Sequence, residues 1–164
     1  MLPKGWLWHQ FSAAVMGSSA GFKIGLPSPW TQTASSLVAH LNQPAKGFHL
    51  NVNLGLWTYV KPLAEAKYLQ AKYAATYHGY KKLLVTAVGF ASIGGFRAAP
   101  AAELKFSWHP LSGPASTELV VLVTLVTKSG VQPYAFHLWA PSASFGAANG
   151  VFHTALKTFR PLPA

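Results

Sequence analysis

The sequence predicts an α+β fold, in which a largely antiparallel sheet of about seven strands is flanked by two main helices, in the order three strands, helix, four strands, helix. Two patterns support this prediction. Short segments alternate apolar and polar residues, as half-buried strands do, and two longer segments repeat apolar residues at spacings of three and four, as amphipathic helices do. Packing the helices on the sheet would bury both sets of apolar faces.

Three strands are predicted before the first helix, over residues 21–26, 36–41 and 48–56. The third has the clearest alternation, because its apolar residues share one face while His49, Asn51 and Asn53 share the other. One face of this strand is therefore expected in the core and the other in water.

The first helix is predicted from Pro62, which suits a first helical turn, to Gly79, which suits the residue after the last turn. Helical spacing assigns a mainly apolar stripe to the buried side: Leu63, Ala66, Gln70, Tyr73 and Tyr77, with Leu69 on its flank. The opposite side, expected to face solvent, carries Lys61, Glu65, Tyr68 and Lys72.

Four more strands are predicted over residues 83–90, 102–108, 119–127 and 134–139. The apolar run Val120–Val123 indicates a central strand covered on both faces, and the turn at 128–130 should join the last two strands as a hairpin. A second helix should begin at Ser142 or Ser144 and end before Pro161. Strand alternation places most of the later tryptophans in the core: Trp30, Trp57, Trp108 and Trp139.

Acidic and thiol side chains are scarce, since the 164 residues include three glutamates (Glu65, Glu103 and Glu118), no aspartate and no cysteine. Most hydrolytic, phosphoryl-transfer and divalent-metal chemistry uses a carboxylate or a thiolate as base, ligand or nucleophile. The composition therefore predicts a non-enzymatic binding protein with no catalytic residue, no cofactor and no metal. A Ser–His–Glu arrangement built on one of the three glutamates is the catalytic alternative that remains.

The net charge of +10 at pH 7 favours anionic surroundings, such as nucleic acid, lipid head groups or an acidic partner. The alternative is a cationic surface suited to the cell exterior, because the lysines are scattered along the chain. The length predicts a single domain over residues 21–161, preceded by a lead-in or weakly signal-like segment over residues 1–20. The longest apolar run, Leu119–Val126, is too short for a transmembrane segment.

Seven histidines raise the question of a metal site, but none forms a His-x-His pair, a helical pair four residues apart or a zinc motif. His49, His109 and His137 lie on the polar sides of predicted strands, where they are expected to face solvent or to form hydrogen bonds. The glycine-rich segment 89–96 lacks the Lys-Ser/Thr of a phosphate-binding loop and is interpreted as a crossover between strands.

The best binding candidate is the outer face of the first helix with the residues that follow it: Lys61, Tyr68, Lys72, Lys81 and Lys82. Helical spacing surrounds an exposed tyrosine with lysines, an arrangement suited to an anionic polymer or an acidic protein surface. The alternative is an ordinary solvated helix face, which Glu65 in the middle of the set favours.

Several residues, taken in order, resemble a known family: Gly21-Phe22, Pro27, Trp30, Leu104–Trp108, Gly130, Tyr134, Ala140-Pro141, Phe152 and Phe159–Pro161. Over residues 21–161 they resemble the PsbP-like α/β/α sandwich, and more narrowly the LpqN-type lipoproteins and the exported sensor domains of some actinobacterial serine/threonine kinases. The resemblance implies an extracytoplasmic, non-catalytic domain and transfers no catalytic residue. The chain departs from these relatives in having no kinase domain, no lipobox cysteine and an unusually basic charge.

The resulting hypothesis is a secreted or surface-tethered recognition or accessory domain of the bacterial cell envelope, which binds a protein or an anionic envelope polymer. A nucleic-acid-binding domain is one alternative, against which stand only two arginines and the absence of a basic cluster. A carrier that holds a small molecule or lipid between sheet and helix is the other.

Overall fold

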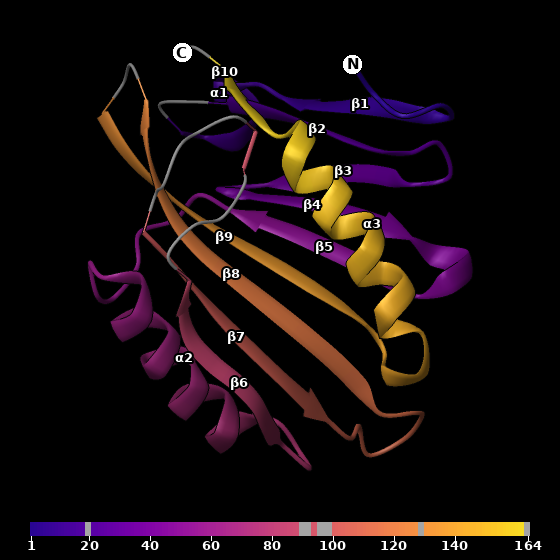
Figure 1. Ribbon diagram of the computed structural model, residues 1–164, viewed down its shortest axis with the longest axis vertical. Helices are drawn as coiled ribbons and strands as arrows, with labels where there is room; N and C mark the ends of the chain where they lie inside the picture. Colours follow the sequence, from indigo (N-terminus) through magenta and orange to yellow (C-terminus); the bar gives the residue numbers. More distant parts are fainter. Residues whose placement is uncertain (19–20, 89–92, 95–99, 128–129, 163–164) are drawn as a thin grey trace.

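The computed structural model describes residues 1–18, 21–88, 93–94, 100–127 and 130–162 (Figure 1). Its strands are β1 (Trp6–Phe11), β2 (Gly21–Pro27), β3 (Thr31–Ser35), β4 (Val38–Gln43), β5 (Phe48–Asn53), β6 (Lys81–Val88), β7 (Ala101–Trp108), β8 (Ser116–Thr127), β9 (Gly130–Pro141) and β10 (Arg160–Leu162). Its helices are α1 (Ala13–Met16), α2 (Pro62–Thr76) and α3 (Phe145–Thr158), with short 3₁₀ turns η1 (Pro44–Lys46) and η2 (Ser142–Ser144).

The strands form two antiparallel sheets. The large sheet has seven strands in the order β3-β4-β5-β9-β8-β7-β6, and the small sheet has three in the order β1-β2-β10. The α+β class, the seven-stranded antiparallel sheet, the four strands between the main helices and the hairpin of β8 with β9 are confirmed.

The membership of the large sheet differs from the prediction. The predicted first strand is β2, which lies in the centre of the small sheet between β1 and β10. Its expected place in the large sheet is taken by β3, whose five exposed residues show no alternation of apolar and polar side chains. Strand β1 lies within the segment 1–20, which was expected as a lead-in, so five strands rather than three precede α2. The domain limits 21–161 stay a prediction.

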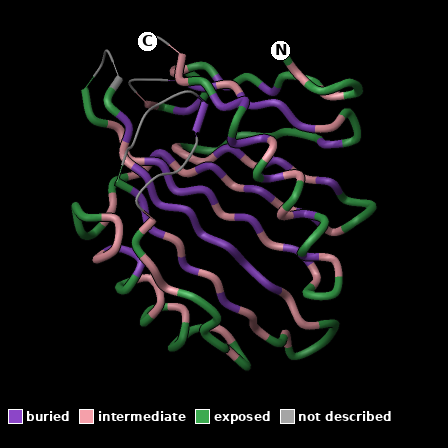
Figure 2. The backbone as a smooth tube through the Cα atoms, viewed as in Figure 1, coloured by how far each residue is buried: buried purple, intermediate pink, exposed green. Residues whose placement is uncertain are grey.

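The core lies on both faces of the large sheet. Alternate residues of β8 divide between two clusters: Val121 and Val123 pack on the α3 side together with the small sheet, and Val120 and Leu122 pack on the α2 side. All four are buried, which confirms the prediction of a central strand covered on both faces. Figure 2 shows this burial running along the middle strands of the sheet.

Helix α2 packs the apolar residues of the predicted stripe against the sheet, and one residue of the opposite side corrects the sequence interpretation. Ala66 is fully buried, and Leu63, Leu69, Tyr73 and Tyr77 pack around it. Glu65, expected in solvent, is instead buried, and its carboxylate accepts a 2.7 Å hydrogen bond from the Tyr59 N–H. The helix also ends at Thr76, and Gly79 serves the turn beyond it with φ of +64°.

Helix α2 covers only part of its side of the sheet. It packs mainly against β6, β7 and β8, its apolar cluster reaches Ala135 of β9, and the same face of β5, β4 and β3 lies beyond it (Figure 1). On that face, cross-strand pairing aligns His137, Asn51, His40 and Thr33 in one row. The polar face predicted for residues 48–56 is therefore confirmed, and it extends across neighbouring strands. None of the described helices has the length and apolar character needed to cross a membrane.

The structure places Phe11, at the end of β1, in the core, which a substitution can test. Phe11 is 2% exposed and stacks on Phe22 with ring centroids 5.0 Å apart, whereas Leu7 on the same strand is 55% exposed. We expect Phe11→Ala to lower the free energy of unfolding by about 3–5 kcal/mol. Leu7→Ala, the matched control, should change it by less than about 0.5 kcal/mol. Urea denaturation followed by circular dichroism measures both, and equal, small effects would show that β1 contributes nothing to the core.

Candidate functional site

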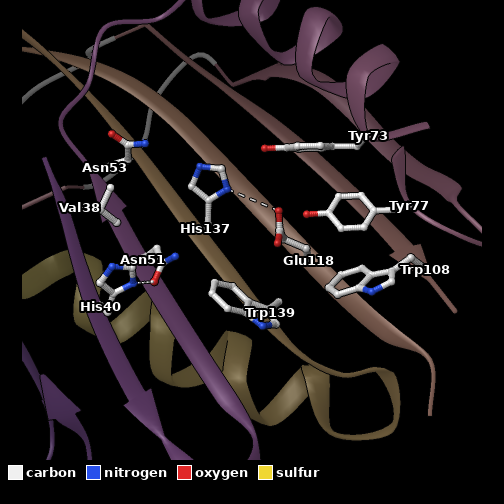
Figure 3. Close-up of a pocket in the computed structure, with 10 residues that line it drawn as sticks. All are labelled: Val38, His40, Asn51, Asn53, Tyr73, Tyr77, Trp108, Glu118, His137 and Trp139. Atoms are coloured by element: carbon white, nitrogen blue, oxygen red, sulfur yellow. Dashed lines mark hydrogen bonds and ion pairs between the residues drawn. The ribbon is translucent and has the colours of Figure 1, made fainter. Parts of the chain in front are cut away.

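A cavity of about 490 Å³ lies on the large sheet beside α2, at the edge of the area that this helix covers. Such a volume falls within the range of ligand-binding pockets. Figure 3 shows the side chains that line it, from β4, β5, α2, β7, β8 and β9: Val38, His40, Asn51, Asn53, Tyr73, Tyr77, Trp108, Glu118, His137 and Trp139. We call this the main cavity.

The strand register brings these residues to one face. Glu118 on β8 lies opposite Trp139 on β9, and His137 on β9 lies opposite Asn51 on β5. Residues opposite each other in paired antiparallel strands point to the same side of the sheet. The floor of the main cavity is therefore set by backbone hydrogen bonding.

Glu118 marks the boundary between the apolar half of this face and its polar half. The residue is 6% exposed, and the Oε2 atom of its carboxylate lies 3.5 Å from Nδ1 of His137. This distance is at the outer limit of a hydrogen bond. The pair therefore supplies one long contact to a carboxylate that burial has removed from most of its water.

Two tyrosines of α2 form one wall. The hydroxyl ends of Tyr73 and Tyr77 point into the main cavity on the side of Glu118 (Figure 3). Burial raises the pKa of both phenols, and the negative charge of Glu118 raises it further. The negative charge of Glu118 therefore disfavours the ionisation of both tyrosines.

Two tryptophans complete the aromatic lining: Trp108, which packs against the core cluster on the α2 side, and Trp139, whose predicted place in the core is corrected. Trp108 packs against Tyr77 with ring centroids 5.2 Å apart, and Trp139 stacks on His49 at 4.9 Å. Both are only partly buried because they face the cavity. Trp30, by contrast, is buried as predicted.

Polar side chains of β3, β4 and β5 form hydrogen bonds with one another beyond the area covered by α2. His40 Nδ1 lies 3.0 Å from Asn51 Oδ1, and His40 Nε2 lies 3.0 Å from the Ser35 hydroxyl. His49 Nδ1 lies 2.7 Å from Asn42 Oδ1, and burial lowers the pKa of His49. These cross-strand contacts fix the side chains at the open side of the cavity.

A second cavity, of about 270 Å³, continues the first along α2. The two share Asn53, Tyr73 and His137, and the second also reaches Glu65. We call the two cavities together the trough. Two of the three glutamates of the chain thus line the trough.

The five residues predicted from the sequence as a binding surface are only partly brought together. Tyr68 and Lys72 line the second cavity, and Tyr68 meets Tyr59 edge-to-face at 5.6 Å. Lys61, at the start of α2, and Lys81 and Lys82, on the edge strand β6, are exposed and line neither cavity. Their role in binding stays a prediction.

The three histidines considered for a metal site each have a different hydrogen-bond partner. His49 meets Asn42, His109 Nδ1 lies 3.1 Å from the Pro110 carbonyl oxygen, and His137 meets Glu118. Within the described part of the chain, no three His, Cys, Asp or Glu side chains are grouped so as to hold a metal ion. The described residues lining the main cavity include Glu118 and His137 but no serine or threonine. The glycine-rich segment 89–96 lies mostly outside the described residues.

Comparison with known proteins relates the chain to two solved structures of the same fold. LpqN of Mycobacterium tuberculosis, described as involved in cell envelope biogenesis, matches with a TM-score of 0.56 and 15% identity over 96% of this chain and 92% of that chain. The Ran-binding protein Mog1p of Saccharomyces cerevisiae matches with a TM-score of 0.57 and 8% identity over 94% of this chain and 95% of that chain. No protein-family model and no curated protein sequence matches the chain.

At these identities the likeness shows a shared fold. The α+β fold that the sequence predicted is therefore confirmed, and its assignment to the PsbP-like superfamily stays a proposal. The closer relation to LpqN-type lipoproteins or to kinase-associated sensor domains stays a proposal.

Replacing Glu118 should change the ionisation of the tyrosines that face it. We expect Glu118→Gln to lower the pKa of Tyr73 and Tyr77, because the lost negative charge no longer disfavours the phenolates. Tyr134 is the internal control: burial alone raises its pKa to about 12, and it packs on the α3 side of the sheet. Carbon-13 shifts of labelled tyrosine rings across an alkaline titration report each residue.

The same linkage predicts an effect on stability. The folded-state pKa of Tyr73 lies above its ordinary value of 10.0, so the unfolded chain loses this proton first and stability falls as the pH rises through and beyond that value. Glu118→Gln lowers the folded-state pKa of Tyr73 and leaves the unfolded-state value unchanged, so the alkaline loss of stability should still begin near pH 10.0 but end at a lower pH and be smaller in total. An unchanged titration of both tyrosines would show that the carboxylate does not face them.

Proposed function

We propose that this chain is a non-enzymatic recognition domain of the bacterial cell envelope, located outside the cytoplasmic membrane, that binds a partner in the trough. The observation that carries the proposal is the half-covered sheet face, where a preformed cavity joins aromatic and hydrogen-bonding side chains. Ligand sites combine these features: a mainly apolar lining and a few fixed polar groups.

The main cavity is better suited to binding than to catalysis. Covalent catalysis of the Ser–His–Glu type needs a hydroxyl or thiol nucleophile within hydrogen-bond reach of the base. Thr117 and Ser142 pair with each other at 2.7 Å, but Thr117 alternates with Glu118 and so points to the opposite face of the sheet. Glu118 and His137 are therefore more useful as fixed polar contacts for a bound group.

The location at the envelope is supported by three observations. The fold is shared with a protein described as involved in cell envelope biogenesis. The sequence resembles exported domains over residues 21–161, and the charge of +10 suits a surface rich in anionic polymers and lipids. Mog1p is described as a Ran-binding protein, which is an example of this fold in a protein that binds another protein.

A second surface favours contact with an anionic envelope component. Leu56 and Val60, in the loop before α2, are 93% and 90% exposed, and Val131, on the hairpin of β8 with β9, is 69% exposed. These three residues line one shallow apolar hollow together with Tyr59, and exposed Lys61 follows directly in the chain. We call Leu56, Tyr59, Val60 and Val131 the apolar tip. Apolar side chains beside a cation suit insertion among anionic lipid head groups.

Two variants distinguish the trough from the lysine surface predicted by the sequence. We expect the double variant Glu118→Gln/Trp139→Ala to reduce retention of the protein by a cell-envelope fraction about tenfold, because it removes the charge and one aromatic wall of the main cavity. Lys81→Gln/Lys82→Gln removes two exposed charges outside the trough and should change retention less than about twofold. Sedimentation with the envelope fraction measures both, and the reverse order would place the binding surface on β6.

The non-enzymatic assignment has its own test. A panel of chromogenic esters, phosphoesters and glycosides should show no turnover above that of Glu118→Gln. A rate that this substitution abolishes in a folded protein would overturn the assignment.

The apolar tip predicts selective binding to anionic vesicles. We expect wild-type protein to sediment with phosphatidylglycerol vesicles and not with phosphatidylcholine vesicles. Leu56→Ser/Val60→Ser should lower the bound fraction several-fold, since each buried aliphatic side chain contributes about 1.5–3 kcal/mol. The matched control is Leu111→Ser, which replaces another exposed leucine (89%) in the loop before β8. Equal loss in the control would mean that the tip has no particular role.

A further inference from the structure

The main cavity has a charge opposite to that of the rest of the molecule. The chain carries 13 lysines and arginines against three glutamates, yet among the described residues the ten that line this cavity include Glu118 and neither lysine nor arginine. A binding site for an anion in so basic a protein would be expected to use some of these cations. The cavity instead presents a carboxylate.

The carboxylate of Glu118 is short of partners. Glu118 is 6% exposed, and among the described residues its one side-chain hydrogen bond or ion pair is the 3.5 Å approach to His137. An ionised carboxylate accepts about four hydrogen bonds, and leaving a buried one incompletely paired is costly. The group is therefore aimed into the cavity with unused capacity to accept donors.

The surrounding groups fit a planar donor. The phenol oxygens of Tyr73 and Tyr77 lie on one side of Glu118, and the indole rings of Trp108 and Trp139 flank it (Figure 3). Hydroxyl oxygens accept hydrogen bonds, and indole faces attract cations. A guanidinium combines these requirements, because its five N–H groups match a carboxylate in a two-pronged geometry while its flat face stacks on aromatic rings.

We propose that the main cavity binds the guanidinium group of an arginine side chain in a partner polypeptide, with Glu118 as its counter-ion. The inference rests on the proposed function, since it names what the trough recognises. A neutral sugar ring would stack on the tryptophans but leave the carboxylate charge uncompensated, and an anion would be repelled by it. The cavity volume of about 490 Å³ leaves room for the aliphatic stem of the side chain and adjoining backbone.

The experiment compares two blocked amino acids that differ in charge and little in shape: N-acetyl-arginine methylamide and N-acetyl-citrulline methylamide. Binding is followed by the indole N–H signals of Trp108 and Trp139 in nitrogen-15 spectra. We expect the arginine probe to bind at least about tenfold more tightly than the citrulline probe, which corresponds to about 1.4 kcal/mol for the charged contact. Free arginine serves as a further arm, because binding equal to that of the blocked probe would indicate a free amino acid instead of a polypeptide.

Matched variants assign the effect to Glu118. Glu118→Gln should weaken the arginine probe at least about tenfold and leave the citrulline probe unchanged. Glu103→Gln is the control, because Glu103 lies on β7 beside Leu104, which faces α2, and so points to the opposite side of the sheet. Tyr77→Phe, which keeps the ring and removes the hydroxyl, provides a second test that does not alter the buried charge, and a loss of about threefold is expected.

The outcomes separate this inference from the proposed function. If the trough variant loses retention by the envelope fraction but arginine and citrulline bind alike, the guanidinium assignment is wrong and the recognition function stands. If glucose binds as tightly as the arginine probe, the cavity is a sugar site and the assignment is likewise wrong. Arginine binding that depends on Glu118 supports the assignment even if the envelope fraction is not retained, and in that case it is the proposed location that fails.

Discussion

The pairing of β8 with β9 is the constraint on which the rest of the site depends. This hairpin puts Glu118 opposite Trp139 and His137 opposite Val120 on one face, while Val121 and Phe136 lie opposite each other on the other face. A shift of one residue in β8 would move Glu118 to the α3 side and bring Val121 to the open cavity. The apolar residues of β8 oppose such a shift, because Val121 and Val123 would leave the larger core cluster. Core packing therefore fixes the position of the polar site.

The two faces of the large sheet differ in how much apolar core they carry. On the α3 side, the helix and the small sheet enclose a continuous core in which Phe159 contacts Phe22, Tyr134 and Phe136. On the α2 side the cluster is smaller, and it ends where polar residues begin on β9 and β5. Because stability comes mainly from the first face, the second can keep a buried carboxylate and an uncovered polar surface at little risk to the fold.

The sequence predicted the elements that have a regular apolar pattern and missed the elements that lack one. β5 was predicted because its apolar and polar residues alternate, β8 because its continuous apolar run indicates a central strand, and α2 because its stripe repeats at helical spacing. β3 was missed because Thr31–Ser35 is polar on both faces, and β10 because Pro161 lies within it. β1 was interpreted as a lead-in because its apolar residues do not alternate regularly with polar ones: Leu7 and Trp8 are adjacent and both are exposed.

The site itself could be predicted only in part, for a related reason. Alternation placed His137 and Asn51 on polar faces, but their meeting with Glu118 depends on which residues pair across three strands, and sequence periodicity carries no such register. Glu65 shows the same limit within a helix: spacing assigned it to solvent, yet the loop before α2 folds back so that the Tyr59 N–H reaches its carboxylate. In both cases the carboxylate is buried, and its hydrogen-bond partner is a residue that sequence periodicity does not bring next to it. The trough therefore holds two of the three carboxylates of the chain, and its larger part, the main cavity, contains Glu118 without a lysine or arginine among its described lining residues.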